Sequence, residues 1–578
     1  MKHTWHYAKK AGWLIAAALL LKLAAAYLEL QIPSALADII YDGVPAAQAA
    51  GNLDPILHYG TIMAIFAVAA FLTNLAGNVL STHASCRITE DMRQDLFRKV
   101  SYLSARQVDE VTISSAISRL TSDTYNVNTM FMRCLRMGVR APILMIGGII
   151  VTLTKDPVLP VALIVMIPLI AFITIKLTRK VIPMFRERQR RLDVMVNAVQ
   201  AGASGIRVIK ALSKTQYEMD HFDKINDDLA EMRYRAGVTN AKIHPITALI
   251  LNLSLVSVIV LGAVRVTGGQ MLPGQIVAFI NYFTIILNAT MSFSGIFMVL
   301  TNGLASAQRI EQVLNMPETM TVEELPPVES EYAVEFRDVC FSYNGVDHNV
   351  SHLSFGLKEG ETLGIIGATG SGKTTILNLL LRLYDVDEGQ ILIGGRDVRS
   401  IPNDELRAMF GVTFQNDFLF ADAIGKNIDF FRDLDPAAVK KAAVLAQAEA
   451  FIEDKGGMDA TLTIRGNNAS GGQRQRLLIA RALAGDPKIL VLDDASSALD
   501  YRTDADLRKA LAENYAHTTK FIVAQRVSSI RSADQILVLD GGEVIGHGTH
   551  DELMASCEAY REIAHIQMET EEVDDSAS

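Results

Sequence analysis

Residues 367–374 read GATGSGKT, a glycine-rich stretch that ends in a lysine and a threonine. An apolar run from Thr362 to Ile366 precedes it, and a helix-like run from Thr375 to Leu383 follows it. This order of strand, glycine-rich loop and helix is the context that a P-loop requires. The N–H groups of such a loop, with the N-terminus of the helix, can cradle the β- and γ-phosphates of a nucleotide. The stretch therefore predicts a site for a nucleoside triphosphate.

Three side chains complete the predicted phosphate and metal site. Lys373 is placed to reach the phosphates, and the hydroxyl group of Thr374 is placed to hold Mg²⁺. The apolar run from Ile489 to Leu492 reads as a strand and ends in Asp493. A carboxylate at the end of such a strand can hold Mg²⁺ beside a P-loop.

Composition indicates several domains and a membrane-embedded first part. The chain has 578 residues, half of them hydrophobic, and its long apolar runs lie before about position 300. The formal net charge of −10 argues against nucleic acid as a partner. The four cysteines have no CxxC spacing, which indicates neither a metal site nor a disulfide framework. Residues 1–10 have no cleavable-signal pattern, and the apolar run after them is long enough to stay as an anchor.

Six apolar runs have the length of membrane-spanning helices, for which about 20 residues suffice. Lysine and arginine collect in segments 86–140 and 178–244, whereas segment 33–55 has aspartates and no basic residue. Basic loops stay on the cytoplasmic side, so both termini and the P-loop are expected in the cytoplasm of a multi-pass protein of the cell membrane. The expected helices cover approximately residues 13–32, 56–80, 125–154, 158–177, 245–264 and 276–300.

The two basic segments are too long for unstructured loops in a compact protein. They are charged at helical spacing and poor in glycine and proline. We expect the membrane helices to continue into the cytoplasm, at about 1.5 Å per residue, and to turn back near residues 104–108 and 213–217.

Two charged residues, Lys22 and Glu29, interrupt the first apolar run. An ionisable residue inside a membrane is a functional hypothesis by default. The alternative is that Glu29 lies near the outer interface and that Lys22 faces a water-lined cavity or another helix. The sequence leaves both interpretations open.

The expected domain layout has four parts. Residues 1–315 form the transmembrane domain, and residues 316–331 form a linker that contains prolines. Residues 332–568 form a soluble nucleotide-binding domain. Residues 569–578 form an acidic tail that we expect to be disordered.

Further motifs follow the P-loop in a fixed order. They are Gln415 in VTFQN, SGGQ at 470–473, the pair Asp493-Asp494, and SALD at 497–500. In this order and spacing they resemble the ATPase domain of ABC transporters. Because six apolar runs precede one ATPase domain, the whole chain resembles an exporter-type half-transporter. Residues 117–123 (ISRLTSD) and 205–211 (GIRVIKA) add a less specific likeness in the membrane part.

The resemblance implies a fold class and a set of roles. The fold is an all-α six-helix exporter domain with long cytoplasmic helix extensions, followed by an α/β P-loop ABC ATPase domain. In this family two ATPase domains meet head to tail, and each ATP lies between the P-loop of one domain and the SGGQ signature of the other. One ATPase domain in the chain therefore implies a dimer, with ATP and Mg²⁺ as cofactors. The residues implied to bind nucleotide are Tyr343 (stacking on adenine), Gly367, Ala368, Thr369, Gly370, Ser371, Gly372, Lys373, Thr374, Thr375, Gln415, Ser470, Gly471, Gly472, Gln473 and Asp500; those implied to serve the metal are Thr374, Gln415 and Asp493.

Three departures from the family pattern concern catalysis. Asp494 stands where the family usually has a glutamate that orients or deprotonates the attacking water. Gln525 stands where a histidine usually contacts the γ-phosphate, and glutamine cannot act as a cation or proton shuttle. Ile464 replaces an acidic residue before the signature. These catalytic positions predict a degenerate site that hydrolyses ATP slowly.

The signature itself is intact at Ser470 to Gln473, although Ala469 replaces the common leucine. The chain can therefore complete a competent site on a partner while its own site is slow. This asymmetry resembles heterodimeric ABC exporters, many of which are multidrug pumps. The predicted partner is a second half-transporter with glutamate and histidine at the two altered positions and a weakened signature.

The predicted activity is the ATP-driven export of hydrophobic or drug-like compounds across the cytoplasmic membrane, with membrane lipid as a further partner. A homodimeric lipid or peptide exporter, a transporter of siderophores, small thiols or haem, and a nucleotide-gated regulator without transport stay open as alternatives. Aromatic and methionine side chains in the sixth run favour adaptable contacts with apolar ligands, but they are equally typical of lipid contact or helix packing. They are Phe283, Met291, Phe293, Phe297 and Met298.

Overall fold

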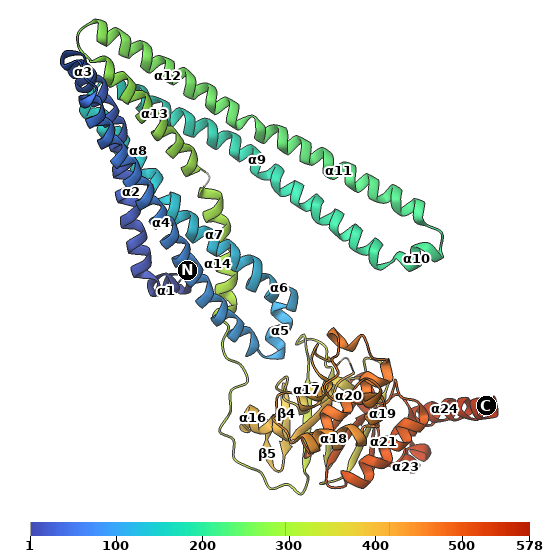
Figure 1. Ribbon diagram of the computed structural model, residues 1–578. Coiled ribbons are helices and arrows are strands. Elements are labelled where there is room, and N and C mark those ends of the chain that lie inside the picture. The colour runs from blue at the N-terminus through green and yellow to red at the C-terminus, as the bar shows by residue number, and fades with distance from the viewer. Residues whose placement is uncertain (1, 295, 416, 578) are drawn as a thin grey trace. The chain divides into compact units, whose positions relative to one another are not determined.

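The computed structural model describes residues 2–294, 296–415 and 417–577. It contains two compact units. Residues Met1–Ser101 and Ile113–Met316 form a helical unit, and residues Tyr102–Thr112 and Pro317–Ser578 form an α/β unit (Figure 1).

The helical unit consists of long helices interrupted by short π-helical turns. The turns are η1 (Ile39–Gly43), η2 (Arg119–Asp123) and η3 (Cys134–Gly138). The helices are α1 (Lys2–Lys10), α2 (Gly12–Asp38), α3 (Val44–Ala50), α4 (Asp54–Ser101), α6 (Ile113–Ser118), α7 (Thr124–Arg133), α8 (Arg140–Lys155), α9 (Leu159–Ser204), α10 (Ile206–Ala211), α11 (Thr215–Ala241), α12 (Ile243–Thr267), α13 (Pro273–Ser294) and α14 (Ile296–Leu314).

Within the described residues, four helical stretches are long and apolar enough to cross a membrane: Gly12–Ala50, Asp54–Ser101, Ile113–Lys155 and Thr215–Thr267. They contain the first, second, third and fifth of the expected spans. The other two expected spans fall on α9 and on α13 with α14, where residue 295 and several side chains lie outside the described residues.

Two helices are much longer than a membrane crossing needs. Helix α4 has 48 residues and α9 has 46, whereas about 20 residues span a bilayer. Helix α4 ends at Ser101, and the short helix α5 (Ala105–Val111) follows, begun by Ser104 in a capping box with Gln107. After α9 the chain turns through α10 and returns along α11.

Apolar stripes hold the helices of this unit together. Ala26 and Leu30 of α2 meet Leu144 of α8 and Tyr282 of α13 in one buried cluster. The Tyr282 hydroxyl donates a hydrogen bond to the Leu30 carbonyl, 2.8 Å away, which satisfies the polar atom inside the cluster. A second cluster joins α9, α12 and α13 and contains Phe283, which is only 2 % exposed. Helix packing, one of the interpretations given for the aromatic and methionine side chains of the sixth apolar run, therefore accounts for Phe283. The other side chains of that set, Met291, Phe293, Phe297 and Met298, lie outside the described residues.

The α/β unit contains two sheets. A four-stranded sheet has the order β2-β1-β4-β5, and a six-stranded sheet has the order β10-β9-β3-β8-β7-β6. Neighbours from β9 to β6 run parallel, and β10 is antiparallel to β9. The strands are β1 (Val334–Phe341), β2 (Val350–Leu357), β3 (Thr362–Gly367), β4 (Glu388–Ile393), β5 (Arg396–Asp397), β6 (Phe410–Thr413), β7 (Ile489–Asp493), β8 (Thr519–Val523), β9 (Gln535–Asp540) and β10 (Glu543–Gly548).

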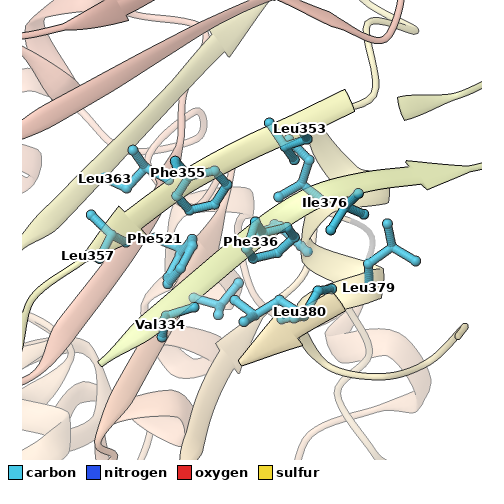
Figure 2. Packing of buried hydrophobic residues seen from close by; sticks show 14 of the residues in the cluster. Val334, Phe336, Leu353, Phe355, Leu357, Leu363, Ile376, Leu379, Leu380 and Phe521 are labelled. Carbon is cyan, nitrogen blue, oxygen red and sulfur yellow. The ribbon is translucent and has the colours of Figure 1, made fainter. Parts of the chain in front are cut away.

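Helices cover these sheets and enclose an apolar core. Figure 2 shows Phe336 and Phe355 of the smaller sheet beside Phe521 of the larger one and Ile376 of a covering helix. The rings of Phe336 and Phe355 are stacked, with centroids 4.5 Å apart. The helices are α15 (Lys373–Leu380), α16 (Asn403–Ala408), α17 (Ile424–Asp429), α18 (Pro436–Leu445), α19 (Glu449–Asp454), α20 (Gly471–Leu483), α21 (Tyr501–Asn514), α22 (Val527–Ile530), α23 (His550–Ser556) and α24 (Glu558–Ala577).

Strand β1 ends at Phe341 because the chain turns there, with Asn349 accepting a hydrogen bond from the Tyr343 N–H. Helix α24 runs from Glu558 to Ala577 and includes most of the acidic tail.

The sheet order determines where the predicted site residues meet. Strands β3, β8 and β7 are parallel neighbours, so their carboxyl ends lie along one edge. Gly367 ends β3, Asp493 ends β7, and Gln525 follows β8. Ligand sites in open parallel sheets lie at this edge, which is where a nucleotide site was predicted.

Candidate nucleotide site

The backbone of the P-loop follows a path that only glycine tolerates at several points. A Cβ on Gly367 would lie 2.2 Å from the Leu539 carbonyl oxygen. Gly370 and Gly372 have φ angles of +86° and +99°, in the region that L side chains rarely adopt. Lys373 donates hydrogen bonds to the carbonyls of Gly367 and Ala368, at 2.9 and 2.7 Å, so its ammonium group lies over the loop.

Thr374 and Asp493 form a pair of oxygen groups beside the loop. The Thr374 hydroxyl donates to Asp493 Oδ2 at 3.2 Å, and Asp493 is 2 % exposed. Burial raises the pKa of the Asp493 carboxyl, and the nearby Asp494 acts in the same direction. Burial also lowers the pKa of Lys373. Both charged groups are therefore poorly solvated here, which strengthens their attraction for an ionic ligand.

The two positions predicted from the sequence to be altered in catalysis contact each other directly. Gln525 Nε2 donates to Asp494 Oδ2 at 2.9 Å, and Gln415 Nε2 lies 3.5 Å from the same oxygen. Asp494 has a φ of +52°, a strained conformation of the kind that collects at functional sites. Burial raises the pKa of Asp494, and the Gln415 amide and Lys373 partly oppose this shift. The Asp494 carboxylate thus already has amide partners on one oxygen.

A cavity of about 600 Å³ gathers most of the predicted residues. Asn349, which the sequence did not indicate, also lines it. Ser371 does not line it: its hydroxyl is buried below the loop, with no hydrogen-bond partner among the described residues. The predicted residues in the lining are Gly367, Ala368, Thr369, Gly370, Gly372, Lys373, Thr374, Thr375, Gln415, Asp493, Asp494 and Gln525.

Tyr343 is outside this lining but is held in place by polar and aromatic contacts. Asn378 donates to the Tyr343 hydroxyl at 3.0 Å. The Tyr343 ring meets the ring of Tyr384 edge to face, with centroids 5.0 Å apart. Tyr384 in turn donates to Asp109 Oδ2 of α5 at 2.6 Å, and burial together with Asp109 raises the pKa of the Tyr384 hydroxyl. Tyr343, the predicted adenine contact, is thereby connected through Tyr384 to the short helix α5.

The signature residues form the start of a helix elsewhere on the same unit. Ser470 caps α20: its hydroxyl accepts from the Gln473 N–H at 3.3 Å, and the Gln473 side chain accepts from the Ser470 N–H at 3.1 Å. Asp500 similarly caps α21 through Thr503. The P-loop cavity is lined by none of Ser470, Gly471, Gly472, Gln473 and Asp500.

The C-terminal helix supports the segment that carries Gln525, a contact that sequence reasoning missed. Gln567 of α24 donates to the Gln525 carbonyl at 2.8 Å and accepts from the Val527 N–H at 2.7 Å. The sequence motifs gave no signal for Gln567, because its role depends on where a distant helix packs.

Ile464, the third departure from the family pattern, is 65 % exposed in a 3₁₀ turn.

A glycine-rich loop with a half-buried lysine over it, a hydroxyl–carboxylate pair and a parallel sheet edge define a P-loop nucleotide-binding ATPase. A model of the ABC transporter transmembrane region matches residues 15–291, and a model described as ABC transporter matches residues 350–497. The chain belongs to the ABC transporters: a helical exporter-type transmembrane domain precedes an α/β ABC ATPase domain. It is a multi-pass membrane protein of the class that couples ATP hydrolysis to translocation.

Relatives resemble it over nearly their whole length. The uncharacterized ABC transporter ATP-binding protein YfiB of Bacillus subtilis (strain 168) is 35 % identical over 572 residues, which is 98 % of each chain. The uncharacterized protein Rv1273c of Mycobacterium tuberculosis is 32 % identical over 562 residues, 96 % of each. The solved structure of a bacterial Atm1-family ABC exporter with ATP bound has the same fold, with a TM-score of 0.79 at 24 % identity over 96 % of this chain and 98 % of that one.

Proposed function

We propose that the chain is one half of a heterodimeric ABC exporter that drives hydrophobic or drug-like compounds out across the cytoplasmic membrane. In this proposal its own ATP site is degenerate, and its signature completes the competent site of the partner. The observation that carries the proposal is the hydrogen bond from Gln525 to the Asp494 carboxylate, because it joins the two altered positions at the place where water activation would occur.

The geometry supports slow hydrolysis at this site for two reasons. Asp494 is one methylene shorter than glutamate, and a displacement near 1 Å can reduce a rate about 100-fold. The Gln525 amide engages the same carboxylate and, unlike histidine, carries no charge and shuttles no proton. Hydrolysis that resets the transporter is therefore assigned to the partner's site.

The residues present fit ATP with Mg²⁺. Mg²⁺ binds oxygen ligands near substrate phosphates, and Thr374 and Asp493 already lie 3.2 Å apart as an oxygen pair. Gln415 lies at the same edge of the cavity and is assigned the link from metal to membrane domain. Bound Mg²⁺ would neutralise phosphate charge, while Lys373 would leave the loop carbonyls for the phosphates. Tyr343 is assigned the adenine contact.

The signature supports the second half of the proposal. The N-terminus of the 13-residue helix α20 favours anions, and its capping box fixes Ser470 and Gln473. These groups lie outside their own P-loop cavity, so they are free to meet the γ-phosphate of an ATP on another subunit. Asp500 is assigned to the same interface.

A gain-of-function experiment tests the proposal. The Asp494→Glu, Gln525→His double variant of the purified complex is expected to raise ATP turnover at this site by roughly 10- to 100-fold. Lys373→Ala in the same background is the control and should abolish the gain. A double variant that hydrolyses ATP no faster than the wild-type complex, or a wild-type chain that hydrolyses rapidly as a homodimer, would contradict the proposal.

A further inference from the structure

A cluster of basic side chains lies inside the membrane part, on helices that the nucleotide site does not use. Lys22 of α2, and Arg133, Arg136 and Arg140 of the segment from α7 to α8, line one cavity of about 460 Å³. Lys22 lies near the middle of the expected span 13–32. Buried charges at such depth are costly and mark functional sites.

Lys22 is buried, and no carboxylate pairs with it among the residues that the structure describes. It is 1 % exposed, and its Nζ donates to the side-chain oxygens of Asn74 and Asn78, both at 2.6 Å. These asparagines lie one turn apart on α4, and Gly77 between them makes room for the lysine stem, since a Cβ there would lie 3.2 Å from Lys22 Cε. The ammonium charge is hydrogen-bonded but not neutralised.

The arginines extend the same positive cavity. Arg136 donates to the Thr82 hydroxyl, and Arg140 pairs with Glu29 at 2.5 Å. Within the described part of the chain, Glu29 is the one carboxylate paired with any of the four cations. The Nε atoms of Arg136 and Arg140 are buried and have no hydrogen-bond partner there. Buried donors without partners are rare in proteins, and these two are available to an acceptor that enters the cavity.

The local backbone supports a binding role. Arg136 lies in η3, a π-helical turn inserted between α7 and α8, and such turns are frequent at functional sites. Met132 and Met137 line the cavity beside the arginines and offer flexible apolar contact. The volume is within the range of small-molecule sites.

We infer that this cavity binds the anionic head group, a phosphate or carboxylate, of an amphiphilic molecule whose apolar body contacts the methionines and the membrane. Arginine and lysine are the side chains that recognise such groups. Four cations and one glutamate leave the cavity with a net positive charge, which a bound anion would offset. The inference rests on the proposed export function, which it deepens by assigning a charge to the cargo or to a bound lipid.

Binding measurements on the full-length chain test the inference without ATP turnover. Dodecyl phosphate, titrated into protein in neutral maltoside micelles, represents a transported anion, and zwitterionic dodecylphosphocholine is its matched control. Palmitoyl-oleoyl phosphatidylglycerol, competing with the phosphatidylcholine analogue in nanodiscs and counted by native mass spectrometry, represents a membrane lipid. We expect preference for at least one anionic probe, weakened about tenfold in each of Lys22→Met and Arg136→Gln.

The controls separate the cluster from general charge effects. Lys155→Gln removes one positive charge at the far end of α8, outside this cavity, and should bind as the wild type does. Unfolding temperatures measured without ligand identify any variant that fails to fold. If one of Lys22→Met and Arg136→Gln fails to fold, the binding measured for the other decides the test. If the two variants weaken binding of phosphatidylglycerol alone, the site is assigned to a membrane lipid. If they weaken binding of dodecyl phosphate, the site is assigned to a transported cargo. No anion preference, or equal loss in Lys155→Gln, overturns the inference, whereas failure of the export proposal would show in turnover and leave this binding unchanged.

Discussion

The P-loop and the signature of this ATPase domain differ in how much of the family pattern they keep. The P-loop keeps its glycines, lysine and threonine, whereas Asp494 and Gln525, which we propose as altered catalytic positions, differ from the usual family residues and are hydrogen-bonded to each other. The signature retains Ser470 to Gln473 as an ordered helix start. We propose that each ATP site combines the P-loop of one domain with the signature of another, and under that proposal the difference predicts that this chain binds ATP at its own P-loop while the faster hydrolysis occurs at the partner's P-loop.

The largest expected effect is loss of binding at the P-loop. Lys373→Ala removes the ammonium group that lies over the loop carbonyls, and a charged hydrogen bond to phosphate is worth roughly 10- to 100-fold in affinity. Equilibrium binding of a fluorescent ATP analogue to the purified chain measures this. Ser470→Ala is the matched control and should leave the affinity of the chain alone unchanged; an equal loss would break the comparison.

The second effect concerns turnover of the complex. Ser470→Ala removes the helix cap and the hydroxyl assigned to the partner's γ-phosphate, so steady-state ATP hydrolysis is expected to fall by about tenfold. Phosphate release by the complex reports the rate. Ala469→Leu, which restores the common family residue next to it, is expected to keep or raise the rate. Undiminished hydrolysis in Ser470→Ala would show that this signature serves no active site.

A smaller effect is expected at the C-terminal helix. Gln567→Ala removes two hydrogen bonds to the segment around Gln525, each worth about 1 kcal/mol. Hydrogen exchange of the Val527 amide should accelerate by roughly fivefold or more, because that N–H loses its partner. Exchange at the signature helix α20 should not change. Uniform acceleration across the domain would indicate general destabilisation instead.

The smallest effect is on stability. Burial raises the pKa of Asp493, so its ionised form opposes folding at pH values above that pKa. This destabilisation decreases as the pH falls toward the ordinary pKa of an aspartate side chain. Asp493→Asn keeps an acceptor for Thr374 and is expected to raise the nucleotide-free melting temperature by about 2–4 °C near pH 7.5. The gain should shrink on acidification; a gain that grows instead would reverse the assigned sign.

The P-loop, the strand ending in Asp493 and the signature could be predicted because each is a local pattern with a fixed backbone context. The meeting of the P-loop and Asp493 at one sheet edge followed from the resemblance, and the strand order β3-β8-β7 provides it, whereas the signature begins a helix elsewhere on the unit. The Gln525–Asp494 contact could not be predicted as a contact, since it depends on two loops after different strands.

Tertiary packing accounts for what sequence reasoning missed. Gln567 lies on a C-terminal helix whose position no motif encodes. Asn378 lies on the predicted P-loop helix, but its contact with Tyr343, like the contact of Tyr384 with Asp109, depends on side chains from separate elements. Lys22 was singled out because a charge inside an apolar run is costly. Its asparagine partners come from another helix and needed the structure to be identified.

The most direct test of the central claim follows both nucleotides of the assembled complex. Radiolabelled 8-azido-ATP is occluded under turnover conditions, crosslinked by light, and identified as triphosphate or diphosphate on each separated subunit. The account predicts intact triphosphate on this chain and diphosphate on its partner, with Lys373→Ala removing only the label on this chain. Diphosphate formed on this chain as fast as on the partner would contradict the claim that its own site binds ATP and hydrolyses it slowly.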